Sequence, residues 1–460
     1  MSRFPLIVPL IVGGAQFMHQ FDGAVIATAL PSMAASLQED PIRPNLAITT
    51  YLLALAVFVP ISGWMAYRFG ARRVFMAAIV VFTASSVLCG IAHSLAELVV
   101  FRVVQGMGGA MMTPVGRVIV LRSVPKLQLV QAMNAITIPA VLGPLLGPSV
   151  GGFIVTYFSW PWIFFINLPI GLLGIVLVRA FIPDIREEGV VPLDLRGSAL
   201  IGIAVAGLVF GFEAIGRGVV PLPAILASIA AGSVCAGLYL RHARRTSAPI
   251  IDLSLLKIPT FTASITGGGL FYLGTTASVF LLALLLQLGF GFTAFQAGLM
   301  TLASAMGSLA TRFTLPPLLR PLGFRRLLIG NALVTSAFLI GCGFFRITTP
   351  FAFIVLTLFI GGFSRSVQFT AAQSLGYAEM PGALVSRATS FMAMAQQLAQ
   401  SFGVGLVALV VHLGLTWHAR EVVAPQDVGL GYFTIGFLAL ASSVIFYRLP
   451  SHAGAELSGR

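Results

Sequence analysis

Charged side chains are scarce in this chain of 460 residues. Asp, Glu, Lys and Arg make up 9% of it and only 14 residues are acidic, whereas 58% are apolar. Because soluble globular domains carry about 25% charged residues, this scarcity excludes an ordinary soluble protein. Apolar stretches near or above the ~20 residues that cross ~30 Å of hydrocarbon recur from end to end. They predict an all-α polytopic membrane protein.

The sequence also lacks the common motifs of nucleotide-binding, metal-binding and hydrolytic sites. The sequence has no phosphate-binding P-loop, no zinc-ligand spacing and no nucleophile elbow. Its three cysteines, Cys89, Cys235 and Cys342, lie in apolar stretches, which favours buried thiols over a disulfide framework or a metal site. We therefore expect no metal, no cofactor and no enzymatic activity.

The basic residues are unevenly placed. The net charge is +13, but most of the arginines lie in short loops between apolar stretches, which indicates membrane orientation and no nucleic-acid partner. If Met1 is cytoplasmic, nearly all the basic loops face the cytoplasm. The opposite face keeps only Arg43, Arg217, Arg346 and Arg420. We expect both termini in the cytoplasm, and a first apolar stretch that is a span and not a cleaved signal peptide.

The apolar stretches predict about fourteen spans. Residues 70–73 read GARR and residues 323–326 read GFRR, so corresponding loops indicate two related halves. The predicted plan is a six-helix bundle over residues 1–185, two inserted transmembrane helices over 186–250 and a second six-helix bundle over 251–450. A short cytoplasmic tail follows over 451–460.

Asp22 is an acid deep inside the first apolar stretch, where a carboxylate costs a few kcal/mol. Arg102 lies in the fourth stretch. Counted at 1.5 Å per residue from the same surface, Asp22 is ~13 Å deep and Arg102 ~10 Å deep, so the two can meet. Pairing keeps a carboxylate ionised and desolvation favours its protonation, which predicts proton coupling at this pair, with a static ion pair as the alternative. His19 lies one turn before Asp22 as a candidate relay or an interhelical hydrogen-bonding residue.

Residues 63–73 read GWMAYRFGARR and connect the second and third stretches. Gly63 and Gly70 permit a tight, closely packed turn, and Arg68, Arg72 and Arg73 anchor the cytoplasmic face. This segment resembles the signature loop of the major facilitator superfamily. The resemblance implies that these five residues act in conformational gating. The acid that the superfamily places four residues after Gly63 is Tyr67 here, so we expect a weaker or differently built latch.

Residues 143–152 read GPLLGPSVGG in the fifth stretch. Small residues at four-residue spacing let helices approach closely, and a proline bends the helix. The segment resembles the motif of antiporters, as opposed to symporters, which implies an antiporter role for Gly143, Gly147, Pro148, Gly151 and Gly152. An ordinary helix-packing face is the alternative.

Three further segments extend the resemblance over nearly the whole chain: FDGAVIATALP at 21–31, RVVQGMGGA at 102–110 and SWPWIFFINLPIG at 159–171. They are similar to the fourteen-helix drug:proton antiporter branch, and residues 108–117 are similar to its MdtD-type multidrug exporters of bacteria. The tryptophans at 160 and 162 fit an interfacial aromatic belt, so we interpret the third segment as one that positions the start of its span at the membrane surface. The implied fold is two six-helix bundles around a cavity, with two accessory helices.

Candidates for the substrate cavity are uncharged or basic. Gln16 and Gln20 extend the polar stripe of His19, Gln396 and Gln400 share a helix face, and Arg365 lies in a later span. Glu213, near the outer end of its span, is expected at the water interface.

The leading hypothesis is a proton-coupled, alternating-access exporter of small amphiphilic compounds in the bacterial cytoplasmic (inner) membrane. Its partners would be a small-molecule substrate, protons and the lipid bilayer, and we expect a monomer. An exporter of an anionic metabolite, such as a carboxylate or its metal chelate, is the alternative that Arg365 suggests. An uptake symporter and a non-transporting sensor are further alternatives.

Overall fold

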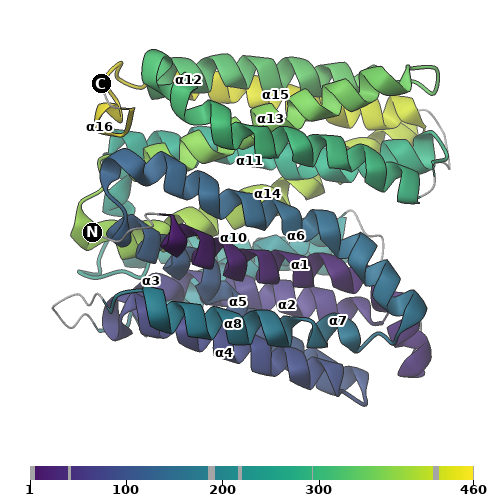
Figure 1. Ribbon diagram of the computed structural model, residues 1–460, viewed down its shortest axis with the longest axis horizontal. Helices are drawn as coiled ribbons and strands as arrows, with labels where there is room; N and C mark the ends of the chain where they lie inside the picture. The colour runs from purple at the N-terminus through teal and green to yellow at the C-terminus, as the bar shows by residue number, and fades with distance from the viewer. Residues whose placement is uncertain are drawn as a thin grey trace.

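The computed structural model describes residues 6–39, 43–184, 192–215, 220–292, 294–417 and 424–458. These residues form helices joined by short turns and contain no strand. Long helices run roughly side by side along the longest axis of the molecule (Figure 1). This is the all-α membrane fold that the apolar stretches predict, since a helix satisfies its backbone hydrogen bonds internally.

The first half of the chain forms one group of helices. A distorted second span combines α2, the short 3₁₀ segment η1 at Pro60, and α3. Another short helix, α7, leads into α8. The bounds are α1 (Ile7–Ser36), α2 (Asn45–Phe58), η1 (Val59–Ile61), α3 (Ser62–Phe69), α4 (Ala71–Gly90), α5 (Leu95–Ser123), η2 (Lys126–Gln128), α6 (Leu129–Tyr157), α7 (Trp162–Phe165) and α8 (Asn167–Phe181).

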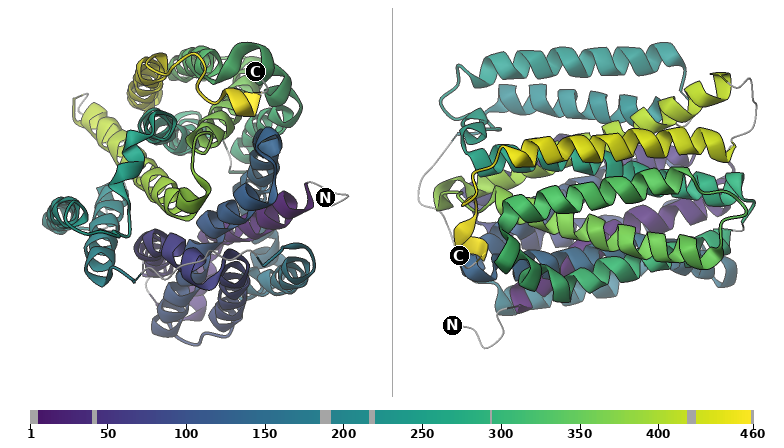
Figure 2. Two further views of the ribbon diagram at one scale, coloured as in Figure 1. Left: turned by 90° about the vertical axis from the view of Figure 1, so that its left-hand side faces the viewer. Right: turned by 90° about the horizontal axis from the view of Figure 1, so that it is seen from above.

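Two helices follow at the edge of the molecule, α9 (Leu195–Ile215) and α10 (Leu222–Ala243). They are the teal pair at the periphery in both views of Figure 2. Helix α9 packs against α2, α14 and α10, so it contacts both halves of the chain. Only 17% of the apolar window of α10 is buried, against 44% for α9. Of the two, α10 is therefore the helix with more surface for lipid.

The rest of the chain forms the second group. Its helices are η3 (Leu253–Lys257), α11 (Pro259–Leu284) with its π-helical end η4 (Leu285–Gly289), α12 (Ala294–Gly343), α13 (Phe351–Gly376), η5 (Gly382–Leu384), α14 (Val385–Trp417), α15 (Pro425–Tyr447) and α16 (Ala455–Ser458). Helix α12 folds back on itself at Gly323, where φ is 71° (Figure 1).

The described residues contain 12 helices that are long and apolar enough to span a membrane. The 30-residue α1 is not among them, and α12 counts once although Gly323 divides it. The predicted total of about fourteen spans therefore stays a prediction, as does the cytoplasmic location of the termini. Helix α1 begins and α16 ends at the same end of the molecule, which we call the terminal end (Figure 1).

The two repeated loops have the same local geometry. Gly70 joins α3 to α4 with φ 88°, and Gly323 joins the two arms of α12 with φ 71°. Because residues with a side chain rarely adopt a positive φ, glycine suits both turns. The correspondence between GARR and GFRR therefore extends from sequence to backbone, which supports two related halves.

At the terminal end the two groups of helices are in contact. The hydroxyls of Ser62 and Ser390 lie 2.9 Å apart, and Arg122 donates to the hydroxyl of Ser386 at 3.2 Å. Lys126 of η2 forms an ion pair with Glu456 of α16 at 2.7 Å. These hydrogen bonds and this ion pair connect the two halves of the chain at the terminal end.

Candidate functional site

Asp22 and Arg102 form an ion pair in the interior of the first group of helices. Asp22 lies near the middle of α1 and Arg102 lies two turns into α5. Arg102 Nη1 is 2.6 Å from Asp22 Oδ2, and the two side chains are 0% and 1% exposed. The predicted contact at matching depth is therefore present. Its role in proton coupling stays a prediction.

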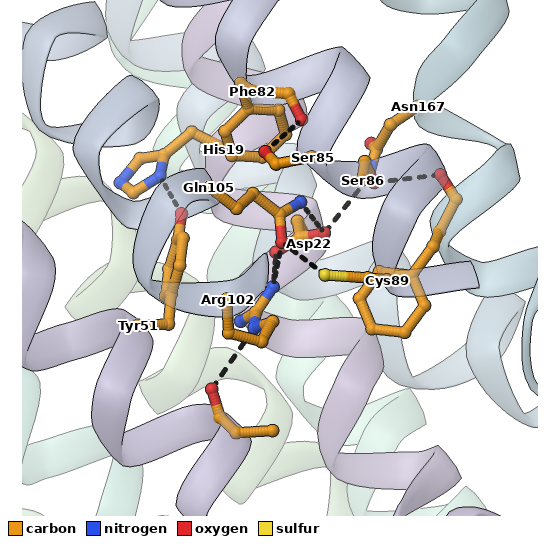
Figure 3. Close-up of polar contacts among 12 residues, drawn as sticks. His19, Asp22, Tyr51, Phe82, Ser85, Ser86, Cys89, Arg102, Gln105 and Asn167 are labelled. Atoms are coloured by element: carbon orange, nitrogen blue, oxygen red, sulfur yellow. Dashed lines mark hydrogen bonds and ion pairs between the residues drawn. The ribbon is translucent and has the colours of Figure 1, made fainter. Parts of the chain in front are cut away.

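The buried carboxylate receives two more donors (Figure 3). Gln105 Nε2 and Asn167 Nδ2 each donate to Asp22 Oδ1 at 3.0 Å. Arg102 also donates to Gln105 Oε1 at 2.6 Å and to the carbonyl of Ala47 at 3.2 Å. A buried ion pair repays its desolvation only when such hydrogen bonds satisfy the remaining atoms. This network satisfies both oxygens of the Asp22 carboxylate, whereas Nη2 of Arg102 has no hydrogen-bond partner among the described residues.

Aromatic rings cover the pair. The guanidinium carbon of Arg102 lies 4.1 Å from the centroid of Tyr51 and 5.8 Å from that of Phe164, both within cation–π range. His19 Nδ1 is hydrogen-bonded to the Tyr51 hydroxyl at 2.5 Å (Figure 3). His19 therefore reaches the ion pair through Tyr51.

Sequence reasoning missed Asn167, Gln105 and Tyr51 as parts of this site. Asn167 lies in the segment interpreted as interfacial positioning, and that interpretation is incomplete. Trp162 is 54% exposed, as an interfacial residue should be, but Trp160 is only 6% exposed, and Asn167 is fully buried and donates to Asp22. An uncharged polar residue inside an apolar span was the available signal, because such a group needs a buried partner.

A cavity of about 370 Å³ lies beside the ion pair, between α1, α2, α9, α11 and α14. Of the predicted candidates, His19, Gln20 and Gln400 line it. It is also lined by Gly23, Tyr51, Leu52, Leu55, Glu213, Phe280, Gln397, Ser401 and Val404. Tyr51 and His19 thus face the cavity on one side and lead to Arg102 on the other.

The other three candidates are not among the residues that line this cavity. Gln16 is buried, and its Nε2 has no hydrogen-bond partner among the described residues. Gln396 accepts from Arg117 at 3.3 Å and from Gln373 at 2.9 Å, which links α5 to α14. Arg365 donates to Ser304 of α12 at 3.3 Å.

The predicted gating residues lie at the terminal end. A Cβ on Gly63 would come within 2.3 Å of the Ser386 carbonyl oxygen, so α3 and α14 touch there through backbone. Arg72 donates to the carbonyl of Arg179 at the end of α8, and Arg73 lies 3.8 Å from Asp184. Arg68 is exposed beside Phe69. Gly63 contacts the second group of helices, whereas the contacts of Arg72 and Arg73 given above lie within the first half of the chain.

Tyr67 stands where an acid was expected. It lines a small cavity at the terminal end together with Asp194 and Arg387. Arg387 of α14 forms an ion pair with Asp252 at 3.2 Å. Asp252 directly precedes η3, so the acid that neutralises Arg387 comes from the connection after the inserted helices.

The glycines of α6 pack on α1 around Asp22. A Cβ on Gly143 would lie 2.8 Å from the Phe21 nitrogen, and one on Gly147 would lie 2.6 Å from the Ala24 Cβ. Gly151 meets Thr28 and Val25 in the same way, whereas nothing lies within 4 Å of a Cβ on Gly152. The Pro148 side chain lies outside what the structure describes. The stripe therefore sets the distance between α6 and the helix that carries Asp22.

Two bundles of long apolar helices, a central cavity and a buried ion pair beside it define a polytopic membrane transporter. The family profile of the Major Facilitator Superfamily matches residues 12–404. The chain belongs to that superfamily, and it is a multi-pass protein of the inner membrane.

Relatives of similar length support this assignment. The chain is 36% identical over 451 residues to "Putative multidrug resistance protein MdtD" of Pectobacterium atrosepticum, covering 96% of this chain and 95% of the relative. It is 35% identical to the protein of the same name in Klebsiella pneumoniae, covering 97% and 95%.

Solved structures share the fold at low sequence identity. The human organic anion transporter MFSD10 has a TM-score of 0.71 at 16% identity, covering 97% of this chain and 100% of that one. The proton:xylose symporter XylE has a TM-score of 0.66 at 16% identity, covering 98% and 97%. At this identity the likeness concerns the fold alone.

Proposed function

We propose that this transporter is a proton-coupled antiporter that exports small amphiphilic compounds by alternating access. The observation that carries the proposal is the Asp22–Arg102 ion pair, buried in α1 and α5 and one aromatic ring away from the central cavity. The MdtD relatives, named for multidrug resistance, support the choice of cargo.

Protonation of Asp22 is the proposed coupling step. In the charged state, the carboxylate neutralises Arg102 and accepts hydrogen bonds from Gln105 and Asn167. A proton on Asp22 would leave Arg102 as a buried cation without a counter-ion, which is a costly arrangement. The bundle would lower that cost by rearranging α1 against α5. Substrate entering from the cytoplasm would favour release of the proton.

Helix α1 would transmit this step to the second half of the chain. The glycine stripe of α6 holds α1 on both sides of Asp22, and α6 also packs against α12 and α13 of the second group. A change at Asp22 would therefore move an element that contacts the other half of the chain. Rocking of the halves around the cavity would follow, as in other transporters built from repeats.

The test is export driven by an imposed pH gradient in proteoliposomes. We expect Asp22→Asn to lose gradient-driven accumulation and to retain exchange of substrate for substrate, because exchange needs no proton. Glu39→Gln, at an acid whose partner is the surface residue Arg43, is the matched control and should export normally. Normal gradient-driven export by Asp22→Asn would contradict proton coupling at this residue.

Export of an anionic metabolite ranks second. It depends on Arg365, which donates to Ser304 and is not among the residues that line the cavity. The described lining residues include the carboxylate of Glu213 and no arginine or lysine. Loss of carboxylate export on Arg365→Gln, with export of cations unchanged, would reverse this order.

A further inference from the structure

A buried arginine lies where the two groups of helices meet. Arg117 lies less than two turns before the end of α5, and only 5% of its surface is exposed. Its Nη2 donates to Oε1 of Gln396 in α14 at 3.3 Å, so the guanidinium points from the first group of helices into the second. Arg117 is therefore a cation inside the contact between the two halves of the chain.

No acid among the described residues neutralises Arg117. The ion pairs that these residues form involve other basic side chains, and none includes Arg117. Its Nη1 also has no hydrogen-bond partner among them. Arg102, by contrast, has the carboxylate of Asp22. Because a charged side chain inside a membrane-spanning helix is costly and is normally paired, the charge of Arg117 needs a counter-ion.

Polar side chains of the second group surround this guanidinium. Gln373 of α13 donates its Nε2 to the same Gln396 Oε1 at 2.9 Å. Tyr272 of α11 and Tyr377 of α13 lie close enough to Arg117 to interact with its charge. The two tyrosines and Gln373 are all buried. Helices α11, α13 and α14 thus contribute to one polar cluster around a cation of α5.

The cluster has hydrogen-bonding capacity that the described residues do not use. The hydroxyls of Tyr272 and Tyr377 have no partner among them, as is the case for Nη1 of Arg117. Oε1 of Gln373 is also unpaired, but it is an acceptor and would not bind an anion. Buried polar groups normally have partners, so three unpaired donors around one charge indicate a ligand. Water could accept these hydrogen bonds, whereas an anion would also neutralise the arginine.

We propose that Arg117, Tyr272 and Tyr377 form a binding site for a small anion, which is a carboxylate group or a halide. The planar edge of a guanidinium fits the two oxygens of a carboxylate, and the hydroxyls would donate to either anion. Because the cation comes from α5 and the hydroxyls come from α11 and α13, the bound anion would link the two halves of the chain.

This site is separate from the wall of the central cavity. Arg117, Tyr272 and Tyr377 are not among the residues that line that cavity. The proposal goes beyond the proposed export function and does not rest on it, since anion binding needs neither a proton gradient nor a transported amphiphile.

The test is thermal unfolding of the purified full-length protein in detergent at pH 7, over a concentration series of sodium acetate and a matched series of sodium chloride. A ligand that binds only the folded protein should raise the unfolding temperature by about 1–2 °C for each tenfold increase above half-saturation. We expect this rise in the wild type and no such rise in Arg117→Gln. Saturation at lower acetate than chloride would identify a carboxylate site, and equal saturation would identify a general site for small anions.

Two further variants separate the anion from the fold. Tyr272→Phe with Tyr377→Phe removes hydroxyls that have no described partner, so the protein should fold, but the half-saturating concentration should rise about 10-fold. Arg365→Gln removes another arginine of a membrane-spanning helix, one that donates to Ser304, and should respond to both salts like the wild type.

An equal rise in the wild type and in Arg117→Gln would reveal a general salt effect and overturn the site. If Arg117→Gln does not fold, the double tyrosine variant decides, and an unchanged half-saturating concentration would overturn the site. A rise that is lost in Arg365→Gln and kept in Arg117→Gln would assign anion binding to Arg365 instead. None of these outcomes depends on whether proteoliposomes of the wild type export an amphiphile.

Discussion

Asp22 is tolerated in an apolar helix because its neighbours satisfy it completely. One cation and two amides bind its two oxygens, and each donor comes from α5 or α8. The value of each donor depends on what its removal leaves behind, since an unpaired buried charge costs more than a lost hydrogen bond. The loss of stability should therefore be larger when a substitution leaves a buried charge unpaired than when it removes a neutral donor or both charges together.

Arg102→Leu should destabilise the protein by about 3–5 kcal/mol, because it leaves the Asp22 carboxylate buried without a counter-ion. The double variant Asp22→Leu with Arg102→Leu should be more stable than Arg102→Leu alone, since both charges are gone. Thermal unfolding in detergent measures both effects. A double variant less stable than either single one would show that the pair itself stabilises the bundle.

Asn167→Leu should cost about 1–3 kcal/mol, because Asp22 and Ser86 each lose a buried hydrogen bond. Gln16→Leu is the matched control within the same bundle. Its Nε2 has no partner among the described residues, so the substitution should be neutral or stabilising. Equal losses from the two substitutions would contradict the role given to Asn167. The measurement is again thermal unfolding.

Packing between helices decides how the site is held. The glycine stripe of α6 places backbone against backbone on either side of Asp22, and the terminal end joins α3 and α5 to α14. The signature loop contributes Gly63 to that junction, whereas Arg72 donates to α8 and Arg73 pairs with Asp184 within the first half. The interface between the halves thus depends on small and neutral residues more than on the loop's charges.

Gly147→Ala should impair transport and cost about 1–3 kcal/mol, because its Cβ would overlap the Ala24 Cβ at 2.6 Å and push α1 away from α6. Gly152→Ala, in the same motif, meets nothing within 4 Å and should be neutral. Gradient-driven export and thermal unfolding compare the two. If both variants behave like wild type, the stripe does not set the position of α1.

Asp252 gives the terminal end a defined response to acid. Burial raises the pKa of its carboxyl, but hydrogen bonds from Ser254 and the hydrogen bond and charge of Arg387 together outweigh burial and hold the pKa below its usual range. Its stabilising contribution is therefore complete above the unfolded-state value of about 4 and is lost as the pH falls through the lower folded-state value.

Asp252→Asn should consequently lower the unfolding temperature at pH 7, and the difference from wild type should shrink as the pH falls below about 4. The measurement is thermal unfolding over a pH series. Glu456→Gln, at the exposed pair with Lys126, should have little effect at any pH because solvent screens exposed pairs. A difference that grows on acidification would refute the assignment.

The helical fold and the pairing of Asp22 with Arg102 could be predicted from the sequence, but other residues of the site could not. The expense of burying Asp22 and Arg102 in lipid requires a partner for each, so their depths were enough to pair them. Asn167 and Glu213 could not be placed in this way. The face of α8 that turns inward depends on packing against α4, and the face of α9 depends on packing against α2 and α14. Because nearly all the neighbouring residues in both helices are apolar, the sequence does not show which face that is.

The two halves of the molecule are in contact at the terminal end, and both contribute residues to the wall of the cavity. The proposed alternating-access cycle requires this contact to open in another state. A disulfide across the terminal end should prevent that opening. The hydroxyls of Ser62 and Ser390 lie 2.9 Å apart on η1–α3 and α14, so Ser62→Cys with Ser390→Cys brings two thiols together. The native Cys89, Cys235 and Cys342 are replaced by serine in this background to prevent other disulfides.

Oxidation of this double variant should stop export, and reduction should restore it, because the proposed cycle separates the halves at the terminal end, which the sequence predicts to face the cytoplasm, to admit substrate. Binding of a lipophilic cation such as tetraphenylphosphonium to the purified protein in detergent should persist in the oxidised form, because Ser62 and Ser390 are not among the residues that line the cavity. Each single cysteine variant, oxidised in the same way, controls for damage to the chain. Undiminished export by the fully crosslinked protein would show that the terminal end does not open during transport.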